Sequence, residues 1–281
     1  MRLGYNTNGL AHHDTLSAIR LLGGLGYQSV ALTVDHHCLP PGHPDTPVQT
    51  QAVKSELQQW GMRNVIETGA RFLLDTQRKH FPTLLSSHSA DRQRRIGYLK
   101  YCIDLAAELN SDCVSLWSGI SDDQVELEHG LERLAHSLQP VLDHAAAAGV
   151  VIGFEPEPGM FIDTMSSFFR LLSWIDHPAL KVTMDLGHLF CQGELPMAPH
   201  IHRWADRLVN IHIEDMRAGQ HVHLMFGEGE MSFPPILEAL KEIDYQYGLH
   251  VELSRDSHRG PEVAAQSLEF LKQQLQQSGN C

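Results

Sequence analysis

Short apolar runs alternate with longer amphipathic stretches along the whole chain. The apolar runs predict eight buried strands, over residues 3–6, 29–33, 64–67, 113–117, 150–155, 181–188, 208–213 and 248–253. The stretches between them predict helices over residues 14–25, 48–60, 90–110, 122–148, 164–174, 201–205, 234–243 and 261–277. Eight strand–helix alternations predict an α/β fold, a parallel sheet closed into a (β/α)₈ TIM barrel, as a single domain over residues 1–281.

An open, doubly wound sheet is the alternative to a barrel. Such a sheet usually carries a glycine-rich phosphate turn after its first strand, and residues 5–9, Tyr-Asn-Thr-Asn-Gly, are not one. Within the barrel pattern, Pro140 predicts a kink or break in the fourth helix. Residues 68–89 are long, polar and irregular, which is typical of a lid over a site.

Four of the predicted strands end in a carboxylate or an imidazole. These side chains are Glu155, Asp185, His212 and Glu252. Because the carboxyl ends of all strands meet at one mouth of a barrel, we expect the four to converge. Oxygen and nitrogen donors without a thiolate suit Mn²⁺, Mg²⁺, Co²⁺, Fe²⁺ or Zn²⁺. The sequence therefore predicts one divalent metal site with these four ligands.

Composition narrows the class of partner. The net charge of −13, with only 21 Lys and Arg, argues against nucleic acid, whose binding relies on basic side chains. Five Cys without a C-x-x-C spacing indicate reduced thiols. No apolar run approaches about 20 residues, and the start lacks the apolar core of a signal peptide. We expect a cytoplasmic protein with no membrane partner that acts on a small molecule; a homo-oligomer is left open.

The strand-end residues form a recognisable set. It comprises Glu155, the pair in Asp185-x-x-His188, His212 in His-Ile-Glu-Asp, Glu252, and His223 four residues before Gly-Glu-Gly. On these residues the sequence resembles the sugar phosphate isomerase/epimerase family of the xylose isomerase-like TIM barrel superfamily. The likeness covers the whole chain as architecture, and its specific matches lie between Glu155 and Glu252.

The resemblance implies roles for these residues. Glu155, Asp185, His212 and Glu252 would bind one divalent metal ion, and the substrate would be a sugar, a sugar phosphate or a cyclitol. His188 and Arg217 would bind substrate oxygens, and we add His223 and Glu157 as substrate-binding candidates. Glu214 and Asp215 are candidate partners of His212 or Arg217.

A site of this kind supports proton transfer next to a carbonyl. A divalent cation bound by two adjacent substrate oxygens stabilises an enediolate. Glu155 and Glu252, on opposite sides of the substrate, are then the catalytic residues that remove and return a proton. Return to the opposite face of the same carbon gives an epimer, and return to the neighbouring carbon gives an aldose–ketose isomer. The sequence does not choose between these reactions.

Three other functions are weighed against this one. On the same site a lyase would expel a hydroxyl group, as inosose dehydratases do. A phosphodiester hydrolase like the type IV apurinic endonucleases is the weaker reading, because that branch expects metal-binding His after strands three and four. Those strand ends carry Glu67 and Trp117 instead. A barrel that binds a metabolite without converting it is least favoured, because both acid/base groups are present.

Two histidine clusters stay open at this point. His188, His221 and His223 are candidates for a second metal site. His36 and His37 follow the second strand at the predicted mouth, where they either contact substrate or are simply solvated.

Overall fold

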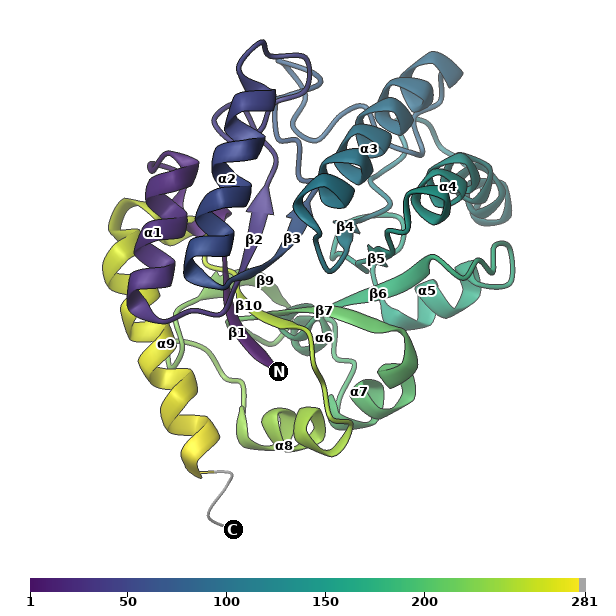
Figure 1. Cartoon of the computed structure of the whole chain (residues 1–281). Coiled ribbons are helices and arrows are strands. Elements are labelled where there is room, and N and C mark those ends of the chain that lie inside the picture. Colours follow the sequence, from purple (N-terminus) through teal and green to yellow (C-terminus); the bar gives the residue numbers. More distant parts are fainter. Residues whose placement is uncertain (278–281) are drawn as a thin grey trace.

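The computed structural model describes residues 1–277, in which eight parallel strands form one closed barrel surrounded by helices (Figure 1). The barrel order is β1-β10-β7-β6-β5-β4-β3-β2, and β1 closes it by pairing with β10. The strands are β1 (Arg2–Asn6), β2 (Ser29–Thr33), β3 (Arg63–Glu67), β4 (Val114–Leu116), β5 (Ile152–Phe154), β6 (Leu180–Asp185), β7 (Leu208–Ile213) and β10 (Gly248–Val251). The (β/α)₈ prediction is confirmed.

The helices form the outer ring around these strands. They are α1 (Thr15–Leu25), α2 (Thr46–Trp60), α3 (Ser89–Leu109), α4 (Leu127–Ala148), α5 (Met165–Leu171), α6 (Leu186–Cys191), α7 (Ala198–Trp204), α8 (Pro234–Glu242) and α9 (Gly260–Gln277), with short 3₁₀ turns η1 (Thr7–Leu10), η2 (Ala205–Arg207) and η3 (Ser254–Arg259). Their inner faces pack on the strands in one continuous apolar core. None of the helices in the described part of the chain is long and apolar enough to cross a membrane.

The fourth helix differs from its prediction. It begins at Leu127 instead of residue 122, and it runs without a break through Pro140. Proline removes one intrahelical hydrogen bond, but the flanking Leu138, Val141 and Leu142 are fully buried. Burial of this apolar face on both sides of Pro140 holds the helix together despite the lost bond.

Two elements near the mouth of the barrel were missed. Helix α6 follows β6 directly, and the Asp185 side chain accepts a hydrogen bond from the His188 backbone N–H at its start. An antiparallel hairpin of β8 (Asp215–Arg217) and β9 (Gln220–Leu224) follows β7. Residues 68–88, between β3 and α3, contain no helix or strand, in line with the irregular segment expected there.

The barrel interior is filled by polar as well as apolar groups. The ring of His250, on β10, lies against Gly4 of β1 and Gly248 of β10, which have no side chains. A Cβ at either glycine would overlap this ring. The glycines therefore make room for a buried imidazole directly below the mouth.

Two glycines inside helices allow a matched stability test. We expect Gly97→Ala in α3 to raise the free energy of unfolding by about 0.5–1 kcal/mol, because its Cβ would meet no atom within 4 Å. Gly23→Ala in α1 should instead lower it by about 1–3 kcal/mol, because its Cβ would overlap the Trp60 ring. Urea unfolding of both variants measures the difference, and equal effects would contradict this packing.

Candidate active site

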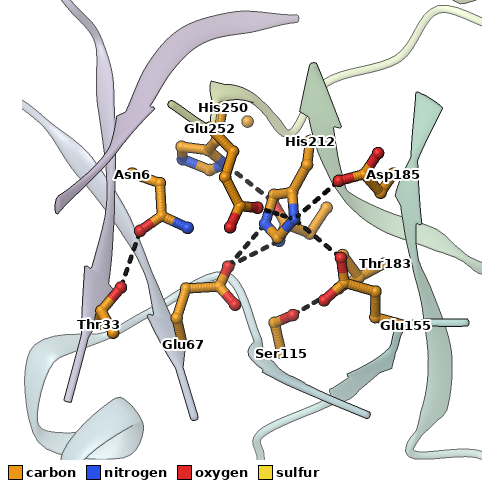
Figure 2. A network of polar contacts seen from close by, with 12 residues as sticks. Asn6, Thr33, Glu67, Ser115, Glu155, Thr183, Asp185, His212, His250 and Glu252 are labelled. Carbon is orange, nitrogen blue, oxygen red and sulfur yellow. Dashed lines mark hydrogen bonds and ion pairs between the residues drawn. The ribbon is translucent and has the colours of Figure 1, made fainter. Parts of the chain in front are cut away.

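Glu155, Asp185, His212 and Glu252 converge at the carboxyl end of the barrel (Figure 2). One donor atom of each lies within 4.8 Å of the donor atoms of the others. Asp185 and His212 are paired in register on β6 and β7, while Glu155 and Glu252 follow β5 and β10 directly. The convergence expected from the four strand ends is therefore present in the structure.

The imidazole of His212 forms the centre of this group. Its Nδ1 lies 3.0 Å from Glu155 Oε1, 2.9 Å from Glu252 Oε2 and 3.9 Å from Asp185 Oδ2. Asp185 Oδ2 is buried and has no hydrogen-bond partner among residues 1–277. Three carboxylates around one nitrogen favour a positive charge there, either a proton on Nδ1 or a cation. Three carboxylates and one imidazole fit a divalent metal ion.

The other ring nitrogen of His212, Nε2, is held by Glu67. Nε2 lies 2.9 Å from Glu67 Oε1, and the Asn210 amide Nδ2 donates to the same oxygen over 3.1 Å. With its Nε2–H donated to Glu67, the ring can direct the Nδ1 lone pair at a cation. Carboxylate–imidazole–metal arrangements of this kind fix the ring and raise its basicity. Glu67 therefore positions His212.

This network continues into the barrel. His250 Nδ1 lies 2.7 Å from Asn210 Oδ1, and His250 Nε2 lies 2.9 Å from Ser29 Oγ. All three residues are fully buried, and burial lowers the pKa of His250 to about 3. A neutral ring donates from Nδ1 to Asn210 and accepts from Ser29, which leaves Asn210 Nδ2 directed at Glu67.

Burial and mutual charge shift the pKa values of the group. Burial, the largest effect, raises the pKa of Glu155 to about 7. For Glu252 burial acts in the same direction, but His212 outweighs it and holds the pKa well below its usual range. Burial disfavours a charged His212, yet the surrounding Glu155, Glu67 and Glu252 raise its pKa well above the usual value. Glu155 and Glu252 therefore differ in proton affinity, as an acid and a base must.

A second cluster of donors lies beside the first. His188, His221 and His223 each place one ring nitrogen within 4.8 Å of the other two. His188 Nε2, His221 Nε2 and His223 Nδ1 are buried without hydrogen-bond partners in the described chain. His223 Nδ1 also lies 3.7 Å from Glu214, whose side chain is fully buried. Burial lowers the pKa of His188 to about 4, so its ring is neutral at pH 7.

Gly187 makes room for Glu214, which borders this second cluster at His223. A Cβ at that position would overlap the Glu214 carboxylate. Asp215 has a different role from the one expected, because its carboxylate accepts the backbone N–H groups of Gly227, Gly229 and Met231. It holds the Gly-Glu-Gly segment and does not contact His212.

A cavity of about 280 Å³ opens above the four strand-end residues. Glu155, His212 and Glu252 line it together with two predicted substrate-binding residues, Glu157 and His223. A third predicted substrate-binding residue, His188, is buried and does not line the cavity. Its Nδ1 lies 3.8 Å from Glu157 Oε2 and its Nε2 lies 3.4 Å from Asp185 Oδ2.

Arg217 does not join this cavity. It is exposed on β8, and its guanidinium donates to the Glu228 backbone carbonyl. The structure therefore gives no support to substrate binding by Arg217, because the β8–β9 hairpin directs its side chain elsewhere.

The irregular segment 68–88 supplies one wall of the cavity. Arg71, Lys79 and His80 line it, together with Trp117 after β4. The His80 and Trp117 rings are in edge-to-face contact at 5.1 Å. Sequence reasoning considered Trp117 as a wall to a sugar ring but missed Arg71, Lys79 and His80, because nothing in an irregular stretch indicates which side chains turn inward.

Comparison with known proteins identifies the fold family. A family model described as xylose isomerase-like TIM barrel matches residues 19–274. The chain belongs to this family. The inosose dehydratase of Lacticaseibacillus casei is 31% identical over 142 residues, 44% of this chain and 47% of the dehydratase. The chain thus spans about half the length of the first relatives that it matches.

Two further similar proteins cover more of the chain. The putative L-ribulose-5-phosphate 3-epimerase SgbU of Escherichia coli K12 is 24% identical over 225 residues, 76% of this chain and 78% of SgbU. A crystal structure of the IOLI protein, with a bound zinc atom, superposes with a TM-score of 0.79 over 99% of both chains at 14% identity. At that identity the likeness concerns the fold alone.

The contact between Glu67 and His212 can be tested by metal affinity. We expect Glu67→Gln to weaken Mn²⁺ binding about ten-fold, because the amide keeps the shape but loses the charge that raises the basicity of His212. Glu56→Gln, a buried glutamate on α2 that pairs with Arg20, is the matched control. Competition with a fluorescent chelator gives both affinities, and equal affinities would refute the positioning role.

Proposed function

We propose that this protein is a metal-dependent isomerase or epimerase of a sugar, sugar phosphate or cyclitol. One observation carries the proposal: the donor atoms of Glu155, Asp185, His212 and Glu252 lie within 4.8 Å of one another below a polar cavity. Relatives with epimerase and dehydratase names support the same class of substrate.

The four residues would hold the cation, which supplies positive charge for the oxygens of a substrate carbonyl and its neighbouring hydroxyl. Glu155 Oε1 and Glu252 Oε2 lie 3.0 and 2.9 Å from His212 Nδ1. One removes the proton from the carbon next to the carbonyl, and the other returns it. The raised pKa of Glu155 suits a group that holds and returns a proton near neutral pH, and the lowered pKa of Glu252 keeps that side chain an ionised carboxylate. Glu157 and His223 face the same cavity and bind substrate oxygens.

A lyase is the second candidate on this site. It is favoured by the 31% identity to an inosose dehydratase. The same proton removal would then be followed by loss of a hydroxyl group from the next carbon, with a side chain such as Glu155 donating a proton to it. An unsaturated or dicarbonyl product distinguishes this reaction from epimerisation.

Phosphodiester hydrolysis has weaker support. The carboxyl end of β3 carries Glu67, which contacts His212, and β4 is followed by Trp117. Neither position supplies the imidazole expected of an endonuclease. The net charge of −13 also disfavours a nucleic-acid substrate.

Replacing Glu155 and Glu252 tests their role in proton transfer. We expect Glu155→Gln and Glu252→Gln each to lower the rate of solvent deuterium exchange into substrate about 10²–10⁴-fold, because an amide cannot carry the proton. Both should also bind metal more weakly. Exchange is followed by NMR over ketoses, aldoses and inososes, with the exposed Glu238→Gln as control. Wild-type exchange rates in both variants would refute the assignment.

The stoichiometry of the metal tests the second cluster. If His188, His221 and His223 bind a second ion, the wild-type chain saturates at two Zn²⁺ and His221→Ala at one. His80→Ala, which alters another cavity histidine, should leave the ratio unchanged. Elemental analysis after dialysis gives the ratio. Saturation at one ion in the wild-type protein would remove the second site and leave the first intact.

A further inference from the structure

A second cavity of about 230 Å³ adjoins the cavity above the metal-site residues. Asn8, Thr33 and Arg71 line both cavities, so the two share a boundary. The second cavity lies over the carboxyl ends of β1 and β2, between η1, the start of α1 and the turn after β2. Nothing in the proposed proton transfer uses it.

Hydrogen bonds hold two of the side chains at the shared boundary, and one of these bonds reaches Glu252. The Asn8 side-chain amide donates to Glu252 Oε1 over 2.6 Å. The Thr33 hydroxyl donates to Asn6 Oδ1 over 2.8 Å, as Figure 2 shows. A group bound in the second cavity would therefore be separated by the Asn8 side chain from Glu252, a carboxylate that we assign to proton transfer.

The two cavities differ in chemical character. Acidic and imidazole side chains dominate the first. The second has an apolar part formed by the buried Leu10 and Ala18 and by Phe72, which is 44% exposed. Polar side chains complete its lining, among them His36 and His37, the pair at the end of β2. A half-exposed aromatic ring beside polar groups is suited to a sugar ring, which has an apolar C–H face and a hydroxylated edge.

The charges argue against an anionic occupant. Arg71, the basic residue other than histidine that lines the second cavity, lies 3.8 Å from Asp35, which lines it as well. The positive charge is therefore balanced in place. An uncharged glycosyl group fits this lining better than a phosphate does.

The volumes of the two cavities favour a ligand larger than one sugar ring. Pockets for small ligands usually measure about 300–1,000 Å³. The metal-site cavity alone falls slightly below that range at about 280 Å³, whereas the two adjoining cavities together fall inside it. One ligand that spans both would be larger than a monosaccharide.

We propose that the second cavity binds a sugar ring attached to the reacting sugar, so that the substrate is a disaccharide or another glycoside. This rests on the proposed function for the reacting part alone. The reacting sugar occupies the metal-site cavity, and the attached ring passes Asn8 and packs on Phe72.

Equilibrium binding to the Mn²⁺-loaded protein tests the proposal without turnover. The probes are D-fructose and three disaccharides that carry α-D-glucose on D-fructose, namely maltulose, leucrose and isomaltulose. We expect at least one disaccharide to bind about ten-fold more tightly than D-fructose, a gain of about 1.4 kcal/mol. Phe72→Ala removes the ring that packs on the sugar, and Ala11→Trp places a large side chain in the cavity from an exposed position.

Both variants should weaken binding of that disaccharide about ten-fold and leave binding of D-fructose unchanged. Phe169→Ala, another exposed phenylalanine on α5, is the control and should change neither. If no disaccharide binds more tightly than D-fructose, or if the two variants weaken both ligands equally, the glycosyl subsite is wrong. Tight, Phe72-dependent binding without any deuterium exchange would support the subsite while refuting the proposed function.

Discussion

The structure depends on the concentration of negative charge around one imidazole. Glu155, Glu252 and Asp185 surround Nδ1 of His212, and Glu67 contacts the opposite nitrogen. Carboxylates cannot be buried together without a compensating positive charge. A barrel that gathers them at one rim must therefore hold a proton or a cation at their centre. That requirement links the fold to its chemistry.

Barrel closure explains how such a centre forms from distant residues. Strands β5, β6, β7 and β10 each contribute one side chain at or directly after the carboxyl end, and the closed sheet fixes the spacing. Gly4 and Gly248 leave space for the His250 ring below the mouth. Through Asn210 and Glu67 this ring reaches His212. The interior of the barrel thus orients His212, while segment 68–88 shapes one wall of the cavity.

The strands were predictable from sequence because buried parallel strands are continuous apolar runs. The four strand-end residues followed from the same pattern, since barrel geometry brings them together. The β8–β9 hairpin was not predictable, because its short strands are polar and partly exposed. The position of Arg217 outside the cavity depends on that hairpin, so it could not be predicted either. From the sequence, Glu67 was noted only because an endonuclease would carry a histidine there. Its contact with His212 could not be predicted, because that contact spans the barrel.

The central claim is that Glu155, Asp185, His212 and Glu252 bind one divalent cation. A crystal structure of the Mn²⁺-loaded protein, with anomalous diffraction data collected at the manganese edge, tests it most directly. The account predicts an anomalous peak that marks a Mn²⁺ ion coordinated by one imidazole nitrogen, that of His212, and by carboxylate oxygens of the other three residues. A peak elsewhere, with these four side chains still bonded only to one another, would contradict it.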